Sequence, residues 1–309
     1  MLNAADAEAF LVARLGRDVS AVSPIARGEW SRAYAFRRGG GQFVARFSAQ
    51  DEDFRKDRIA ADYSSRALPI PAIVEIGETS GGFFAISERA PGGFLDDLDA
   101  DQMRGMLPAL FAALDAARQV DLSASTGYGS WGADGNAPHQ SWRAALLAIA
   151  EDQPGERTHG WRERLVASPT GSGLFDEALA RLDALIPDDA QERHLIHSDL
   201  LNYNVLGADG RINAVIDWGC AMYGDFLYDL AWFEFWSPWY AAWRGIDFRS
   251  EAARHYASIG LTVPRFEERL TCCQIHIGLA AQAYNAFKER WDAIEETARR
   301  TIEVAGVEQ

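Results

Sequence analysis

The sequence has few cysteines, and their spacing does not suit cross-linking or zinc binding. Only Cys220, Cys272 and Cys273 are present among 309 residues, and no pair has the CxxC spacing of a zinc site. The adjacent residues Cys272 and Cys273 could bond to each other only with strain. We therefore predict three reduced thiols in the core, without a disulfide framework.

Long apolar runs and an excess of positive charge are also missing. No stretch approaches the roughly 20 apolar residues of a membrane span, and the start, MLNAADAEAF, lacks the order of a secretion signal. The 30 Lys and Arg residues face 45 Asp and Glu residues, which gives a net charge of -15 and opposes binding to nucleic acid. We predict a cytoplasmic protein that binds neither membrane nor nucleic acid. Its acidic surface could attract a polycationic small molecule or could serve solubility alone.

The hydrophobic pattern divides the chain into two parts. Residues 1–90 show a helix over residues 3–16, three strands within residues 21–48, a helix over residues 53–67, and two strands around Gly81-Gly82. Residues 91–309 have mainly helical spacing, with short strands between His194 and Trp218. We predict an α+β protein with a bilobal architecture: an N-terminal lobe with a five-stranded antiparallel sheet and one main helix, and a mainly helical C-terminal lobe with short catalytic hairpins.

The segment HLIHSDLLNYNVL, which starts at His194, concentrates polar side chains between apolar runs. Its residues His197, Asp199 and Asn204 fit the pattern H-x-D-x-x-x-x-N, and Asp217 follows after one hairpin, as in the catalytic loop of kinases. Phosphoryl transfer needs a carboxylate that accepts the proton of the attacking hydroxyl, which is the role predicted for Asp199. It also needs oxygen ligands for Mg²⁺, which Asn204 and Asp217 can supply. The alternative is a turn whose polar groups only satisfy the backbone.

The stretches around this motif resemble the aminoglycoside phosphotransferase family, which consists of small-molecule kinases with the bilobal protein-kinase fold. The resemblance runs from about residue 28 to residue 239 and is greatest to the hygromycin B branch, through GEWSRAYAF, ALPIP, STGYGSWG, RHLIHSDLLNYNVL, GRINAVIDW and FWSPW. It implies a monomeric enzyme that uses Mg²⁺ and ATP, or GTP as an alternative donor. Its implied substrate is a cationic aminoglycoside of the hygromycin B type, whose phosphorylation confers antibiotic resistance.

The resemblance also assigns residues to the nucleotide site. Arg46 stands where protein kinases carry a phosphate-binding lysine, and its expected partner on the following helix is Asp57 rather than Asp62. An ordinary surface charge on a strand is the alternative for Arg46. Ser198 stands where the wider family has glycine, and Trp218 where protein kinases have phenylalanine.

The first hairpin lacks a full GxGxxG, so its backbone near Gly28 and the hydroxyl of Ser31 are expected to cover the phosphates. The backbone between Glu88 and Ala90, where the two lobes join, is expected to pair with the base of the nucleotide.

The stretch after the predicted metal ligand leaves no room for the activation segment on which a protein kinase binds a peptide. GCAMYGD leads directly to FLYDLAWFEFW, which predicts a small acceptor held by the helical lobe. We expect Asp229, Glu234 and Trp236 to contact it, because carboxylates pair with ammonium groups and aromatic faces pack on sugar rings. Asn202 either shapes the catalytic loop or contacts the acceptor as well. Core packing is the alternative for the aromatic side chains, and Asp225 is expected to cap a helix or brace the catalytic loop.

Two other functions stay open from the sequence. One is a kinase of a small metabolite alcohol such as choline or homoserine, which a substrate panel would distinguish. The other is an inactive nucleotide-binding module, against which the joint presence of Asp199, Asn204 and Asp217 argues.

Overall fold

The five strands of the N-terminal lobe form one antiparallel sheet with the order β1-β2-β3-β5-β4. The computed structural model describes residues 3–28, 30–186 and 192–306. The elements of this lobe are α1 (Ala4–Leu15), β1 (Ser20–Arg27), β2 (Ser31–Arg38), β3 (Gly41–Ser48), α2 (Glu52–Ala61), β4 (Ile73–Thr79) and β5 (Gly82–Glu88).

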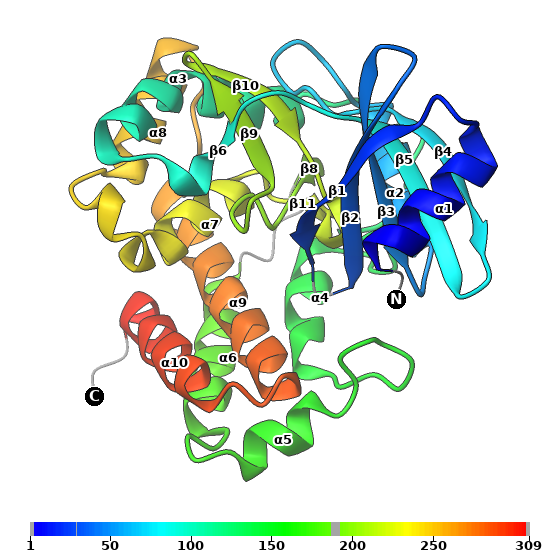
Figure 1. The fold of residues 1–309 in the computed structure, drawn as a ribbon. Coiled ribbons are helices and arrows are strands. Elements are labelled where there is room, and N and C mark those ends of the chain that lie inside the picture. Colours follow the sequence, from blue (N-terminus) through cyan, green and yellow to red (C-terminus); the bar gives the residue numbers. More distant parts are fainter. Residues whose placement is uncertain (1–2, 29, 187–191, 307–309) are drawn as a thin grey trace.

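Both helices of this lobe lie beside its sheet (Figure 1), but they contribute to two different cores. Helix α1 is capped by Asn3, whose side chain accepts a hydrogen bond from the Asp6 amide, and it buries Ala7 and Leu11 against the sheet. Helix α2 instead contributes Ala60 to the large core of the C-terminal lobe. Because α2 packs toward the second lobe, it can place side chains in a site between the lobes.

Helix α2 ends at Ala61, so the prediction of a helix up to residue 67 is wrong at its C-terminal end. The hydroxyls of Ser64 and Ser65 accept hydrogen bonds from the amides of Ile70 (2.9 Å) and Leu68 (3.1 Å). These bonds offer the backbone an alternative to the helical pattern and stabilise the turn that precedes β4.

The C-terminal lobe is mainly helical, as expected for this α+β fold. Its helices are α3 (Ala100–Arg118), α4 (Trp142–Leu147), α5 (Trp161–Ala167), α6 (Gly173–Leu185), α7 (Leu227–Trp236), α8 (Phe248–Ser258), α9 (Phe266–Phe287) and α10 (Trp291–Ala305). Its strands are β6 (Gly93–Phe94), β7 (Gly129–Ser130), β8 (His194–Ile196), β9 (Val205–Ala208), β10 (Arg211–Val215) and β11 (Met222–Gly224). Short 3-10 helices are η1 (Leu95–Asp97), η2 (Ala148–Ala150), η3 (Trp218–Cys220), η4 (Ser237–Trp239) and η5 (Ala241–Trp243).

Two small sheets position the predicted catalytic segment. Strands β10, β9 and β6 form one, and β7, β11 and β8 form the other. The catalytic loop connects β8 of one sheet to β9 of the other, and Asp217 follows β10. Strand β6 pairs with β9 directly after the chain has left the N-terminal sheet, which ties the crossing between the lobes to the catalytic hairpin.

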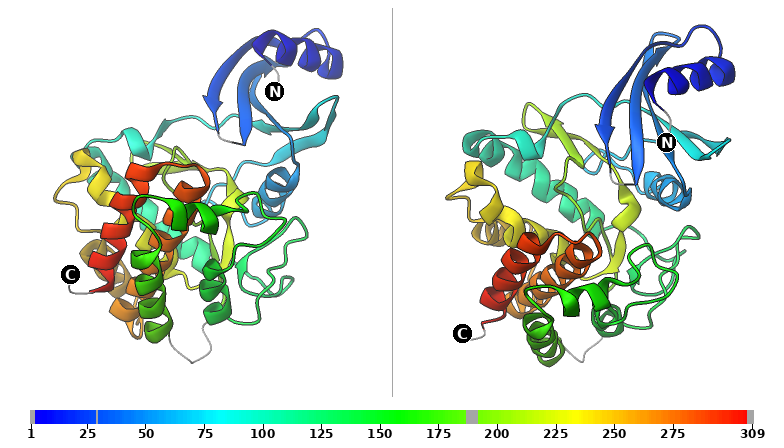
Figure 2. Two further views of the ribbon diagram at one scale, coloured as in Figure 1. Left: turned by 90° about the horizontal axis from the view of Figure 1, so that it is seen from below. Right: turned by 60° about the horizontal axis from the view of Figure 1, so that its bottom comes forward.

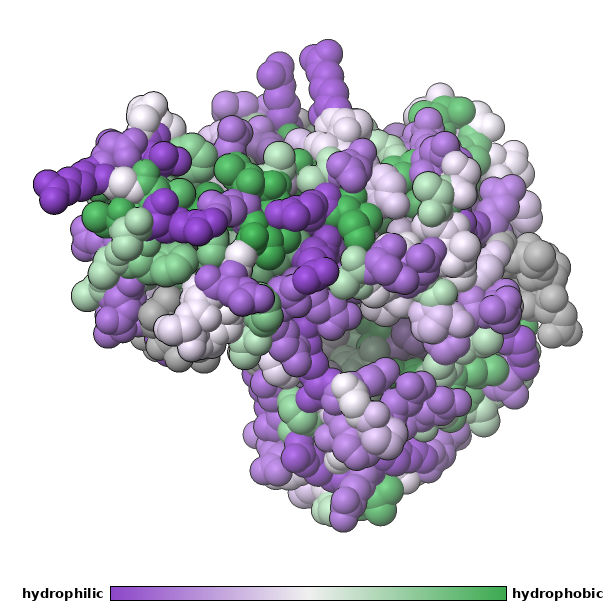
Figure 3. Space-filling model, turned by 90° about the vertical axis from the view of Figure 1, so that its right-hand side faces the viewer, coloured by the Kyte–Doolittle hydropathy of each residue, from purple (hydrophilic) through white to green (hydrophobic). Residues whose placement is uncertain are grey.

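The two lobes are distinct in space. Figure 2 shows the sheet and α1 standing apart from the helical body, with α2 on the side that faces it. From the side, the surface is hollowed between the upper and lower parts of the molecule, and hydrophilic side chains surround the hollow (Figure 3). In the part of the chain that the structure describes, no helix has the length and apolar character that crossing a membrane requires.

The three cysteines are unpaired, as predicted. Cys272 and Cys273 are buried in α9, but Cys220 is exposed in η3, so its predicted place in the core is wrong. It lies directly after the predicted metal-binding turn, where the chain follows the surface between the lobes.

Candidate active site

His197 holds the catalytic loop in shape. Its Nε2–H donates to the carbonyl of Ile216 (2.9 Å), and its Nδ1 accepts from the amide of Asp199 (3.2 Å). Burial lowers the pKa of His197 to about 4, so the ring is neutral and has the one donor and one acceptor that these bonds require. The imidazole therefore links the loop after β8 to the end of β10.

The carboxylate of Asp199 is oriented by two amides of the same loop. Asn202 Nδ2 donates to Asp199 Oδ1 (2.7 Å), and Asn204 Nδ2 donates to Asp199 Oδ2 (3.2 Å) and to the Asp199 carbonyl (2.7 Å). Burial, assisted by the charge of Asp217 and opposed by these hydrogen bonds, raises the pKa of Asp199 to about 8. A carboxylate with a raised pKa is a stronger base, which suits the acceptance of a proton from a hydroxyl.

Asp229 fixes the first turn of the catalytic loop. Ser198 has a φ of 60°, a left-handed conformation that costs a non-glycine residue about 1–3 kcal/mol. The buried Asp229 carboxylate accepts from the amides of His197 (2.9 Å) and Ser198 (2.8 Å), and the Ser198 hydroxyl donates to the Cys220 carbonyl (2.6 Å). The prediction that Asp229 contacts the substrate is therefore wrong. Asp229 is only 4% exposed, and both of its carboxylate oxygens accept hydrogen bonds from the backbone of the loop. It has the bracing role that the sequence suggested for Asp225.

Asp96 fixes the second turn of the loop and was not identified from the sequence. Asn202 and Tyr203 both have left-handed backbones, with φ of 68° and 67°. The Asp96 carboxylate accepts from the amides of Asn202 (2.9 Å) and Tyr203 (3.1 Å) and from the Tyr240 hydroxyl (2.9 Å). No local motif signals this residue, because its partners lie more than 100 positions away in the chain.

Asp217 and Asn204 fit the predicted Mg²⁺ ligands. The amide nitrogen of Asn204 is used by Asp199, which leaves its Oδ1 to serve as a ligand. Restricted solvation between the lobes raises the pKa of Asp217 to about 6, helped by the charge of Asp57 and opposed by Arg46. Among the described residues, no group of three His, Cys, Asp or Glu side chains could hold a metal by itself. Two protein oxygens are nevertheless a typical set for Mg²⁺ that also binds nucleotide phosphates.

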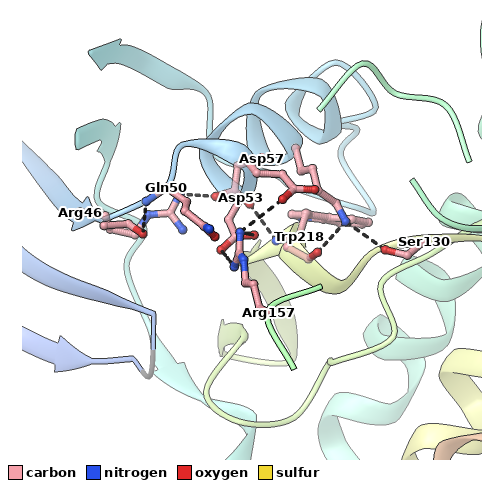
Figure 4. A network of polar contacts seen from close by, with 11 residues as sticks. Arg46, Gln50, Asp53, Asp57, Ser130, Arg157 and Trp218 are labelled. Atoms are coloured by element: carbon pink, nitrogen blue, oxygen red, sulfur yellow. Dashed lines mark hydrogen bonds and ion pairs between the residues drawn. The ribbon is translucent and has the colours of Figure 1, made fainter. Parts of the chain in front are cut away.

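Arg46 on β3 forms an ion pair with Asp57 on α2, the partner expected from the sequence (Figure 4). The other oxygen of Asp57 accepts from the amide of Trp218 (2.7 Å), next to the predicted metal ligand. Burial opposes the charge of Arg46, but Asp57 and Asp217 raise its pKa above the ordinary value, so the side chain is a permanent cation. The site thus combines a fixed positive charge with the loop that carries Asp217.

Lys56 is a second contact from α2 to this loop. Its buried Nζ donates to the carbonyl of Gly219 (2.5 Å) and to the Ser130 hydroxyl (3.3 Å). Lys56 was not identified from the sequence, since the pattern of the helix gives no sign of a buried lysine. Together with Asp57, which binds the amide of Trp218 (Figure 4), it holds residues 218 and 219 against α2.

The residues expected around the nucleotide lie at the edges of this site. Gly28 and Ser31 flank the tip of the β1–β2 hairpin, whose residue Glu29 lies outside the described part of the chain. Glu88 ends β5, and Ala90 lies between β5 and β6, where the chain passes from one lobe to the other. Their roles toward the nucleotide stay predictions.

Two of the expected acceptor contacts are on α7. The Glu234 carboxylate accepts from the Arg249 amide (3.0 Å) and forms an ion pair with the Arg249 side chain (3.4 Å). Trp236 packs edge-on against Trp239, with ring centroids 5.2 Å apart, so the core-packing alternative applies at least to this face of its ring. Contact of Glu234 and Trp236 with an acceptor stays a prediction.

The bilobal fold and the oriented Asp199, with Asn204 and Asp217 as the predicted metal ligands, indicate a kinase-like phosphotransferase. The chain belongs to the phosphotransferase enzyme family, whose model matches residues 21–266. The chain is 37% identical over 242 residues to the hygromycin-B 4-O-kinase of Escherichia coli. The matched residues make up 78% of this chain and 69% of that protein.

Solved structures agree with this assignment. The crystal structure of aminoglycoside phosphotransferase APH(4)-Ia is 31% identical, covers 98% of this chain and 99% of its own, and superimposes with a TM-score of 0.85. A thermostable mutant of that enzyme, in a ternary complex with AMP-PNP and hygromycin B, has a TM-score of 0.83 at 32% identity and covers 98% and 99% of the two chains. The GDP complex of aminoglycoside 2'-phosphotransferase-IIIa, at 16% identity, a TM-score of 0.65 and 99% coverage of both chains, shares the fold. The predicted fold class and family resemblance are thereby confirmed.

Proposed function

We propose that this protein transfers the γ-phosphoryl group of ATP to a hydroxyl of a cationic aminoglycoside of the hygromycin B type. The observation that carries the proposal is the Asp199 carboxylate, held by Asn202 and Asn204 in the loop between β8 and β9. The likeness to the hygromycin-B 4-O-kinase supports this acceptor, and the ternary complex of the related enzyme with AMP-PNP supports ATP as the donor.

Each polar residue has a defined task in this reaction. Asp199 accepts the hydrogen bond of the acceptor hydroxyl and takes its proton as the bond to phosphorus forms. Asn204 and Asp217 would hold Mg²⁺, which would neutralise negative charge on the nucleotide phosphates. Arg46, fixed by Asp57, donates to phosphate oxygens.

The path of the chain after Asp217 supports a small acceptor. Only η3 and β11 separate Asp217 from Leu227, the first residue of α7, which leaves no segment on which a peptide could lie. The net charge of -15 favours a cationic substrate. A phosphate adds about -1.5 to -2 charges to such a drug and weakens its attraction to ribosomal RNA, which would confer resistance. We expect the enzyme to act in the cytoplasm, as a monomer.

The test is ADP release by the purified protein with Mg²⁺-ATP and a panel of acceptors. We expect turnover with hygromycin B and none with choline or homoserine, and Asp199→Ala serves as the blank. Turnover with a metabolite alone would contradict the proposal. A parallel series with GTP decides the donor.

A further inference from the structure

Arg157 connects the helical lobe to α2 of the N-terminal lobe. It lies in the loop between η2 and α5, and its guanidinium donates to both oxygens of Asp53, from Nη1 at 2.7 Å and from Nη2 at 3.0 Å (Figure 4). Its Nη2 also approaches Glu52 Oε2 at 3.5 Å. Both partners of the main pair are largely shielded, with side chains 23% and 19% exposed. A bidentate pair of this kind is stronger and geometrically better defined than an ordinary surface ion pair.

Asp53 also contacts the segment after Asp217, which is the predicted metal-binding loop. A Cβ atom added to Gly219 would lie 3.1 Å from Asp53 Oδ1, so the carboxylate packs directly against this glycine. Lys56 and Asp57 lie three and four positions further along α2, on the same face, and bind residues 219 and 218. Arg157 therefore secures the first of three successive contacts that hold α2 against the loop after Asp217.

The same guanidinium also reaches the hairpin that is expected to cover the phosphates. It lies 5.7 Å from the ring centroid of Trp30, at the tip of the β1–β2 hairpin. The Trp30 ring stacks on Phe287 at the end of α9, with centroids 6.5 Å apart, and Lys288 Nζ is 4.7 Å from its centroid. Cation–π contacts of this kind are attractive because the face of an aromatic ring carries negative charge density. Arg157 thus touches both N-terminal elements that border the nucleotide, α2 and the hairpin.

We propose that Arg157 is a positioning residue for nucleotide binding, which sets the distance between the lobes around the Mg²⁺-nucleotide. Through Asp53 it holds α2 against the metal-binding loop, and so it keeps Arg46 and Asp57 at a fixed position relative to Asp217. Through Trp30 it holds the hairpin over the phosphates. This inference rests on the proposed kinase function, but it concerns the nucleotide and not the acceptor.

The test compares Arg157→Ala, Asp53→Asn and the double variant. Calorimetry measures the Kd for Mg²⁺-AMP-PNP without acceptor, and kinetics give separate KM values for ATP and for the acceptor. We expect Arg157→Ala to raise the nucleotide Kd and the KM for ATP about tenfold and to leave the KM for the acceptor unchanged. The nucleotide Kd of the double variant should be no higher than the higher Kd of the two single variants, because both substitutions remove the same Arg157–Asp53 contact.

Two further variants control for general damage to the fold. Arg299→Ala removes an exposed ion pair with Glu295 within α10 and should change neither KM. Arg157→Lys keeps the charge but loses the bidentate fork, so its Kd should lie between those of the wild type and Arg157→Ala. Should Arg157→Ala not fold, Arg157→Lys decides the question alone.

An unchanged nucleotide Kd in the folded Arg157 variants would overturn the inference, as would equal increases in both KM values. A weakened nucleotide Kd without turnover of any aminoglycoside would contradict the proposed acceptor and leave this inference standing. A wild-type protein that binds no Mg²⁺-nucleotide would overturn both proposals.

Discussion

At the scale of single residues, Asp199 and Asp217 share a site but have different surroundings. Asp199 accepts two side-chain amide bonds from its own loop, whereas Asp217 lies next to a segment that α2 holds through Asp57. These surroundings support the roles that we propose: the first carboxylate binds the acceptor hydroxyl, and the second binds a metal ion.

This difference predicts separable effects of two substitutions. Asp199→Ala should lower kcat by two to four orders of magnitude, as loss of a general base typically does, while the Kd for Mg²⁺-AMP-PNP changes little. Asp217→Ala should weaken nucleotide binding as well, because the nucleotide binds together with the metal. Calorimetry with Mg²⁺ present measures both, and equal nucleotide affinity in the two variants would contradict these roles.

The buried Asp229 should matter for the shape of the catalytic loop. Asp229→Asn retains one acceptor oxygen but turns an NH₂ group toward one of the two backbone amides, which leaves that amide unsatisfied. The expected loss of stability is about 1–3 kcal/mol. Because Ser198 depends on this bond for its left-handed backbone, kcat should fall as well, while the KM for ATP stays the same. Urea unfolding and steady-state kinetics test this; a stable variant with full kcat would show that the brace is dispensable.

At the scale of elements, α7 and α9 are joined by charged and polar groups that the periodic pattern did not reveal. Asp225, just before α7, is 2% exposed and forms a bidentate ion pair with Arg269 on α9, with both N–O distances 2.7 Å. Tyr228 on α7 shares a 2.8 Å hydrogen bond with His276 on α9. The core between these helices is therefore partly polar.

Removing one partner of the buried ion pair should destabilise the protein strongly. Arg269→Ala leaves the Asp225 carboxylate buried without its counter-charge, at an expected cost of about 3–5 kcal/mol. Arg254→Ala is the matched control, because Arg254 pairs with Glu251 on the surface of α8, where such pairs contribute about 0–1 kcal/mol. Equal midpoints of denaturant unfolding for the two variants would contradict the interpretation.

The buried His276 predicts a pH dependence of stability. Burial lowers its pKa to about 4 from the ordinary 6.5. Between these values the unfolded chain binds more protons than the folded protein, so this group leaves stability unaffected above pH 6.5 and lowers it as the pH falls toward 4. His276→Gln does not titrate and can still bond to Tyr228, so its Tm should fall less than that of the wild type between pH 6.5 and 5. Parallel slopes of Tm against pH would refute the assignment.

Much of the fold follows from local pattern, and the errors have physical causes. The five strands of the N-terminal sheet and the mainly helical character of residues 91–309 were predicted because their apolar spacing is regular, and the Asp199 loop because its motif lies within one short segment. Strands β7 and β11 span only two or three residues and have no detectable periodicity. Asp96, Lys56 and the bracing role of Asp229 depend on contacts between distant segments, which a single sequence does not encode locally.

At the scale of the whole molecule, the two lobes divide the reaction between them. The N-terminal lobe supplies a fixed cation, Arg46, paired with Asp57, and the C-terminal lobe carries Asp199, Asn204 and Asp217, for which we propose the roles of base and metal ligands. We place the boundary between residues 1–90 and 91–309, where the chain leaves β5 and enters β6; this division stays a prediction. Because α2 belongs in sequence to the first lobe but contributes to the core of the second, closure around a nucleotide should move α2 together with the Asp217 loop.

The central claim is that Asp199 activates a hydroxyl of an aminoglycoside for attack on ATP. The most direct measurement is the mass spectrum of hygromycin B after incubation with Mg²⁺-ATP and either the wild-type protein or Asp199→Asn, an isosteric variant that lacks the basic carboxylate. We expect the wild type to convert the drug to a monophosphate and the variant to leave it unmodified over the same time. Unmodified drug with the wild type, or equal conversion by both proteins, would contradict the account.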